Sequence, residues 1–220
     1  MQNKIKIYSI TNGRSTHAYS YKSILKNSGI SDVILIENKT WKDALAYCVD
    51  TCDTNYFLRV DDDFILHPKA ILYMNTCIVD SNVAVYFWRL WEDHSHSIIH
   101  AIKVYSINAL RNIGGFKFDY MGKVDMATHK FLKKSGYKVV EDKSILAIHT
   151  CGTKEEQIEY NELWKKQSKN YTKARFASSL LYDKSIKYQY DLRTNFLEKL
   201  NKKHNTPFAK WLDENNFNTT

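Results

Sequence analysis

Several residue types and patterns that mark particular protein classes are scarce or missing in this sequence. It has only 7 glycines and 2 prolines among 220 residues, which excludes a collagen-like chain and argues against disorder. No apolar run approaches the ~18 residues that a membrane-spanning helix needs, so any membrane contact is expected to be peripheral. The sequence also lacks a glycine-rich phosphate loop, which argues against a phosphoryl- or nucleotidyltransferase.

Cysteine is equally scarce. The four cysteines are Cys48, Cys52, Cys77 and Cys151, and their spacing matches no zinc-binding motif. Cys48 and Cys52 lie four residues apart in a predicted helix and therefore share one of its faces. No signal peptide is recognisable at the N-terminus. These features predict reduced, mostly buried thiols in a cytoplasmic protein.

What the sequence does contain is enough apolar material for a sizeable core. With 44% hydrophobic residues in 220, it forms one large domain or a core domain with an appendage. The formal net charge is +8, which favours an anionic partner such as a nucleotide, nucleic acid or an anionic lipid surface. The oligomeric state is left open.

The first 60 residues alternate between strand and helix patterns. Strands are predicted at residues 4–10, 32–37 and 56–60, with helices from 15 or 16 to about 27 and from 41 to 52. This alternation is typical of βαβ units and a parallel sheet. In such sheets ligands bind beyond the carboxyl ends of the strands. Those ends carry Thr11, Glu37 and Asp61, which predicts that these three residues surround one crevice.

Three consecutive carboxylates follow the third strand. Asp61 and Asp63 are expected to project from one face and Asp62 from the other, because successive strand side chains alternate. Two carboxylates on one side need a cation or hydrogen-bond donors beside them. A hard divalent ion that also binds substrate phosphates is a suitable partner. The simpler interpretation is an acidic loop before the helix predicted from Pro68 to Asp80.

The middle of the chain predicts further strands and one helix. Strands at 82–91 and 98–105 flank a polar segment, 92–96, as a hairpin or as neighbouring strands; the segment itself is a solvated turn or a functional loop. A helix is expected from Asp125 to Ser135. Strands at 137–140 and 144–149 follow, and the second ends in His149. Arg14 and Arg59 also lie near the predicted crevice.

The last third of the chain has a helical pattern. Helices are predicted from about residue 153, over 174–203, and from Pro207. Basic and aromatic residues interleave here, including Lys165, Lys166 and Lys169. This pattern is typical either of a solvated helix face or of a surface that binds phosphates and stacks on sugars or bases. We therefore divide the chain into a core domain, 1–152, and a helical extension, 153–220.

One string carries a family resemblance. RVDDDFILHPKAI resembles the metal-binding DxD segment of family-2 glycosyltransferases, with Asp61 and Asp63 as the motif acids. The GGF at 114–116 and the GYKV at 136–139 resemble the second half of the same family. Asp125 matches the second acid of its catalytic pair, while Val124 replaces the first. The resemblance covers about residues 4–150.

The resemblance implies a fold, an activity and a set of site residues. The fold would be GT-A-like (Rossmann-like): an α/β sandwich whose mixed, mainly parallel sheet is flanked by helices, with a helical C-terminal extension. The activity would be metal-dependent, inverting transfer from a nucleotide-sugar, most simply a UDP-sugar, to a carbohydrate or glycolipid hydroxyl. The alternatives are transfer to hydroxylated bases in DNA and a catalytically silent binding module.

Each site residue receives a role from this reading. Mn²⁺ or Mg²⁺ would be held by Asp63, Asp61 and His149, and the donor nucleotide by Thr11, Glu37, Asp61 and Asp62. Asp125 would be the general base, with a pKa raised by burial, or would simply cap its helix. Asp119, Glu92 and Asp93 are the alternative bases.

Overall fold

The computed structural model describes residues 5–27, 33–93, 97–118, 124–150 and 190–217. Within these ranges the strands are β1 (Ile5–Thr11), β2 (Val33–Glu37), β3 (Tyr56–Asp61), β4 (Phe64–Leu66), β5 (Val83–Glu92), β6 (Ser97–Ser106) and β7 (Lys138–His149). The helices are α1 (His17–Leu25), α2 (Trp41–Thr51), α3 (Ala70–Cys77), α4 (Ile107–Asn112), α5 (Val124–Lys134), α9 (Tyr190–Lys203) and α10 (Pro207–Glu214).

The strands form a seven-stranded sheet in the order β2-β1-β3-β6-β5-β7-β4. The first three strands are parallel, as the βαβ pattern predicts, and their register aligns Thr11 with Glu37 and Ile10 with Asp61. β5 and β6 are neighbouring antiparallel strands, in agreement with the prediction of a hairpin or of neighbouring strands. β6 is also antiparallel to β3, and β7 is parallel to β5. The predicted mixed α/β sheet is confirmed, with three parallel and three antiparallel pairings among the described strands.

Three elements differ from the sequence prediction. The two strands expected at 137–140 and 144–149 are one strand, β7, because the polar stretch between them stays alongside β5 through register shifts. The helix α4 and the short strand β4 were not predicted at all. β4 follows the three aspartates directly and pairs antiparallel with β7, which sets Phe64 opposite His149. This pairing joins the third strand's acidic end to the end of β7.

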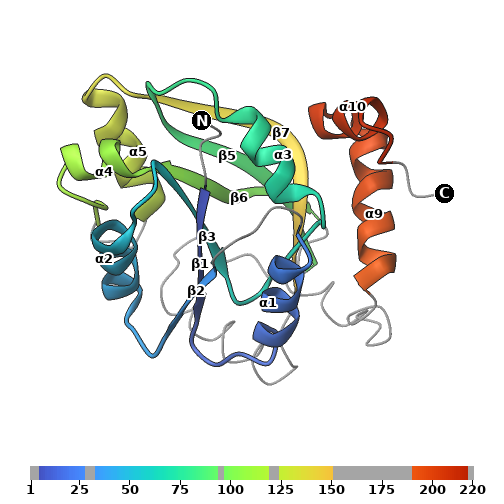
Figure 1. Ribbon diagram of the computed structural model, residues 1–220, viewed down its shortest axis with the longest axis horizontal. Coiled ribbons are helices and arrows are strands. Elements are labelled where there is room, and N and C mark those ends of the chain that lie inside the picture. Colours follow the sequence, from blue (N-terminus) through green and yellow to red (C-terminus); the bar gives the residue numbers. More distant parts are fainter. Residues whose placement is uncertain (1–4, 28–32, 94–96, 119–123, 151–189, 218–220) are drawn as a thin grey trace.

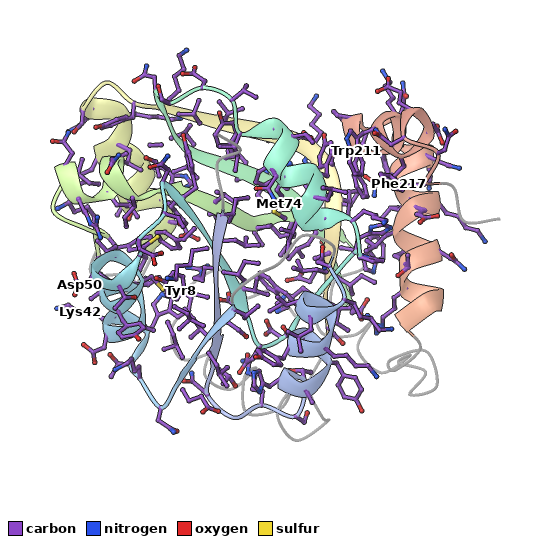
Figure 2. The ribbon with its side chains drawn as sticks, viewed as in Figure 1. Tyr8, Lys42, Asp50, Met74, Trp211 and Phe217 are labelled. Atoms are coloured by element: carbon purple, nitrogen blue, oxygen red, sulfur yellow. The ribbon has the colours of Figure 1, made fainter. Side chains whose placement is uncertain are left out.

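Helices cover both faces of the sheet, as expected (Figure 1). On one face α1, α3 and α10 pack against residues such as Leu58 and Trp88. On the other face α2, α4 and α5 pack against residues such as Phe57 and Tyr105. Figure 2 shows Tyr8 of β1 beside α2, and its hydroxyl lies 3.0 Å from Thr51 Oγ1. The core therefore has two layers, one on either side of the sheet.

The C-terminal helices pack against β7 at the side of the molecule away from α5 (Figure 1). Asn201 of α9 is fully buried and bonds both backbone groups of Ile145, accepting from its N–H at 2.9 Å and donating to its carbonyl at 2.8 Å. The Phe208 N–H donates to Ser144 Oγ at 2.9 Å. α10 starts at Pro207, as predicted, with Thr206 as its N-cap. Residues 151–189, including Lys165, Lys166 and Lys169, lie outside the described residues.

The described residues include most of the cysteines and seven helices, which bear on the predictions about thiols and membrane contact. Cys48, Cys52 and Cys77 are free thiols, and the first two are buried; Cys151 lies outside the described ranges. None of the described helices is both long enough and apolar enough to cross a membrane.

Candidate active site

The candidate site lies where the carboxyl ends of β1, β3, β5 and β7 meet. β1 ends at Thr11 and β3 at Asp61, which are adjacent in the parallel register. β5 ends at Glu92 opposite His149, the last residue of β7. The parallel pairing of β1 with β3 explains the first meeting and that of β5 with β7 explains the second, while the β4–β7 pairing brings the two together. The predicted site residues Thr11, Asp61 and His149 therefore lie at the same end of the sheet, where these strands have their carboxyl ends.

Asp62 holds the loop after β1, and its Oδ1 lies 4.0 Å from Arg14 Nη1, the same atom that contacts Asp63. Asp62 Oδ2 accepts hydrogen bonds from Thr11 Oγ1 at 2.9 Å and from the Asn12 N–H at 3.1 Å. The Gly13 N–H in turn donates to Thr11 Oγ1 at 2.9 Å, and Gly13 has a φ of 82°, which favours glycine. Asp62 and Thr11 thus shape the loop that carries Arg14.

Asp63 lies at the centre of the Asp63 cluster, which also contains Arg14, His149 and Glu92. Asp63 is buried, and its Oδ2 contacts both Arg14 Nη1 and His149 Nε2, the latter at 3.0 Å. The other ring nitrogen of His149, Nδ1, lies 3.5 Å from Glu92 Oε1. The Thr150 N–H donates to the Asp63 carbonyl at 2.8 Å, which fixes the backbone between the two residues.

Charge complementarity sets the protonation states in this cluster. Burial would raise the pKa of Asp63, but His149 and Arg14 hold that pKa below its usual value. Burial would lower the pKa of His149, but the Asp63 carboxylate, with help from Glu92, raises it to about 10. Asp63 is therefore ionised and His149 protonated at neutral pH.

The Asp63 cluster has part of the donor set that a divalent metal needs. Asp63 Oδ2 and His149 Nε2 lie 3.0 Å apart, the distance of a hydrogen bond from the protonated imidazole to the carboxylate. No described group of three or more His, Cys, Asp and Glu side chains is gathered for a metal, however. A metal at this pair would have to displace Arg14 from Asp63 and the proton from His149. Once freed from these contacts, Asp63 and His149 would supply one oxygen and one nitrogen ligand, and the further ligands would come from substrate and water.

A second group of charges, the Asp125 cluster, lies between β3, β6 and α5. Asp125 is in the first turn of α5 and receives a hydrogen bond from Lys103 Nζ at 2.8 Å and from Tyr105 Oη at 2.7 Å. Arg59 Nη1 lies 3.8 Å from Asp125 Oδ1, and Arg59 Nε lies 3.3 Å from Asp61 Oδ1. This buried Asp61 oxygen accepts no hydrogen bond from any described residue. Arg59 therefore lies between Asp61 and Asp125, the predicted base.

The pKa predicted for Asp125 is wrong. Burial would raise it, but the positive charges of Arg59 and Lys103, with the hydrogen bonds from Lys103 and Tyr105, hold the pKa of Asp125 well below its usual range. Burial does raise the pKa of Asp61, against the opposing charge of Arg59. The prediction from sequence considered burial alone, because the two cations, Arg59 and Lys103, belong to other elements of the fold, β3 and β6. Asp125 is thus ionised at neutral pH, and it is a weaker base than a free aspartate while these contacts persist.

The other predicted site residues lie in varied surroundings. Glu37 is exposed at the end of β2, beside Thr11 in the register. Asp93 accepts from both Nη atoms of Arg193 at 3.1 Å, which ties the site's edge to α9. Glu92 faces His149, and Asp119 lies outside the described residues.

Sequence reasoning missed three residues of the Asp125 cluster: Lys103, Tyr105 and Trp41. The Trp41 ring lies against the Arg59 guanidinium, whose central carbon is 4.3 Å from the ring centroid. A signal was present in the sequence, because Lys103 interrupts an apolar strand between Ile102 and Val104. A charged residue at an inward-facing strand position needs a buried partner.

Comparisons with known proteins agree with this fold. No known family model matches the sequence, and no curated protein matches it either. Among solved structures, the chain is similar to the mannosyltransferase PcManGT from Pyrobaculum calidifontis in complex with GDP-Man and Mn²⁺. The TM-score is 0.55 at 11% identity, over 88% of this chain and 69% of that one. S. aureus TarS 1-349 is similar with a TM-score of 0.53 at 12% identity, over 80% and 70% of the two chains.

At such identities the similarity is one of fold alone. The fold is GT-A-like, as the sequence predicts: a curled mixed sheet between helices, shared with an enzyme that binds a nucleotide-sugar. Any function must then be argued from the site residues of this chain.

Proposed function

We propose that this protein is a metal-dependent, inverting glycosyltransferase that moves a sugar from a nucleotide-sugar to a hydroxyl of a carbohydrate or glycolipid acceptor. The observation that carries the proposal is the meeting of Asp61, Asp63, His149 and Asp125 at one edge of a GT-A-like sheet. The fold is that of a mannosyltransferase whose structure contains GDP-Man and Mn²⁺. The free thiols of Cys48 and Cys52 agree with a reducing compartment, and we place the reaction in the cytoplasm.

On the donor side, Asp63 and His149 would hold Mn²⁺ or Mg²⁺. The ion, when bound, supplies Lewis-acid stabilisation of the departing diphosphate. Asp61, the third predicted metal ligand, keeps 26% of its side chain exposed, so its carboxylate is accessible to a metal-bound water or to a ribose hydroxyl of the nucleotide. Thr11 and Glu37 are adjacent at the ends of β1 and β2, the positions that we assign to the donor nucleotide, and Asp62 holds the loop between Thr11 and Arg14. Displaced from Asp63, Arg14 would be near enough to contact the diphosphate of a UDP-sugar or a related donor.

On the acceptor side, Asp125 would receive the proton of the attacking hydroxyl. Its carboxylate is ionised at neutral pH and its side chain is 30% exposed, so an acceptor can reach it. A base acts mainly in the transition state, where the hydroxyl proton becomes far more acidic than in the free alcohol. Asp125 is therefore the residue that we assign to proton transfer.

Metal-dependent nucleotide binding tests the donor side of this proposal. Isothermal titration of UDP and GDP, with and without Mn²⁺, should show binding that requires the metal, and an assay of donor hydrolysis should show turnover. Asp63→Ala should abolish both effects. Asp213→Ala, an exposed carboxylate on α10, is the matched control and should change neither.

Two results would contradict the proposal. Absence of metal-dependent binding of any nucleoside diphosphate or nucleotide-sugar would remove the donor site. Binding that depends on the metal, without hydrolysis or transfer to any acceptor, would instead identify a nucleotide-sugar binding module.

A further inference from the structure

Two cations are buried in the middle of the sheet next to the candidate site. Arg59 of β3 is 7% exposed and Lys103 of β6 is 8% exposed, and they are direct partners in the antiparallel register. Their neighbours along each strand are apolar residues of the core, Leu58 and Val60 on one strand and Ile102 and Val104 on the other. Removing such charges from water costs several kcal/mol each, which needs compensation.

One carboxylate, that of Asp125, offsets much of the cost of burying these two cations. Lys103 Nζ and Tyr105 Oη donate to the two different oxygens of Asp125, at 2.8 and 2.7 Å. Arg59 Nη1 approaches one of these oxygens at 3.8 Å while its Nε faces Asp61 at 3.3 Å. The Trp41 ring covers the guanidinium and limits its movement. Two hydrogen-bond donors, Lys103 and Tyr105, and one ion-pairing cation, Arg59, thus hold Asp125 from strands of the sheet.

We propose that Arg59, Lys103 and Tyr105 are positioning residues, which keep the Asp125 carboxylate ionised and oriented toward the acceptor while Arg59 links it to Asp61 on the donor side. The inference rests on the proposed function, in which Asp125 receives a proton. It adds three residues to the reaction that neither the acidic motif nor the fold identifies. None of them needs to touch the substrate.

Stability alone is a poor explanation of this cluster. A buried ion pair seldom stabilises a protein more than apolar residues of similar size would, although loss of one partner is costly. The arrangement is also one-sided, because the donors are buried while Asp125 keeps 30% of its side chain exposed. A carboxylate that buried residues hold in place, and that is itself partly exposed to solvent, is preorganised for a reaction partner.

The charged and titratable groups that face Asp125 come from three elements. β3 contributes Arg59 and Asp61, β6 contributes Lys103 and Tyr105, and α5 contributes His129, one turn after Asp125. Burial lowers the pKa of Lys103, and Asp125 opposes that shift. Burial lowers the pKa of His129 to about 4, so its ring is neutral at pH 7. The cations that oppose protonation of Asp125 at neutral pH are therefore Arg59 and Lys103.

A titration of the Asp125 carboxyl by ¹³C NMR tests the proposal without donor or acceptor. The resonance is assigned by its loss in Asp125→Asn. In the wild-type protein the carboxyl should stay ionised over the pH range in which the protein is folded. In Lys103→Met its pKa should rise by about 1–3 units, and Lys103→Arg should restore most of the original behaviour.

Two further variants separate positioning from folding. Tyr105→Phe keeps the ring contacts with Phe57 and Phe116 but removes one hydrogen bond, so it should raise the pKa of Asp125 without unfolding the protein. The pair Lys103→Met with Asp125→Asn should be as stable as the wild type or more stable, because no uncompensated charge remains.

The kinetic result should agree with the titration. In Lys103→Met the acidic limb of kcat should move to higher pH by the same amount, with the KM for the donor nearly unchanged. An unchanged Asp125 pKa in both Lys103→Met and Tyr105→Phe would overturn the proposal, as would a paired variant as unstable as Lys103→Met alone. Because the titration needs no turnover, its failure is distinct from the absence of transferase activity.

Discussion

The two carboxylates central to the proposed reaction are held by cations of different kinds. In the Asp63 cluster the arginine belongs to the loop after β1, next to Gly13, and its side chain is 37% exposed. In the Asp125 cluster the cations are Arg59 and Lys103, which are buried within strands. Both carboxylates lie near the same sheet edge, and both have a pKa below the usual value.

The difference indicates what each cluster can do. A loop arginine can leave its partner when a stronger cation arrives, since its backbone is not part of the sheet. Arg59 and Lys103 are neighbours in the strand register and their side chains are buried, so the geometry around Asp125 is set before any substrate binds. The first cluster is suited to exchange a partner, and the second is suited to keep one.

The largest expected effect is on turnover and concerns the fixed cluster. Asp125→Asn should reduce kcat by about 10²–10⁴-fold, the usual contribution of a general base. The affinity for a nucleoside diphosphate should stay nearly unchanged, because a base acts in the transition state rather than in donor binding. Steady-state kinetics and calorimetry measure the two quantities. Near-normal turnover would transfer the role to Asp119, Glu92 or Asp93, the last two of which are near His149 and Arg193 respectively.

The next effect is on stability and compares the two arginines directly. Arg59→Met should lower the free energy of unfolding by about 3–5 kcal/mol, because it leaves Asp61 and Asp125 buried with one cation fewer. Arg14→Met should lower it by less than about 1 kcal/mol, since the arginine is partly exposed and His149 stays on Asp63. Urea denaturation measures both variants. Equal losses of unfolding free energy in the two variants would contradict the proposed difference between a buried strand arginine and a partly exposed loop arginine.

The smallest effect is a pH dependence on the Asp125 side. The pKa of His129 falls from 6.5 to about 4 on burial, so the unfolded chain binds a proton there that the folded chain does not. Stability should therefore decrease as the pH falls from about 6.5 to about 4. His129→Gln removes this contribution, and its pH profile should be flatter by on the order of 1 kcal/mol between pH 7 and pH 5. Parallel profiles for the two proteins would contradict a neutral buried His129.

Much of the fold was predictable because its signals are local. The strands ending at Thr11, Glu37 and Asp61 are short apolar runs bounded by polar residues, and Thr40 caps α2 within four residues of sequence. The short strand β4 was not predictable, since a three-residue strand has too few positions to show alternation. The gap expected within β7 was wrong for a related reason. Its polar residues Glu141 and Asp142 find partners on Arg89 and Tyr73, which no local pattern reveals.

The sequence by itself determined that an acidic tip ends a buried strand and that a histidine ends a later one, because both features follow from hydrophobic patterns a few residues long. Only the tertiary structure decided that Asp63 meets His149, 86 residues away, through the pairing of β4 with β7. It also decided the protonation of Asp125, because a pKa depends on the distances to charges, and Arg59 and Lys103 reach that carboxylate from two other strands.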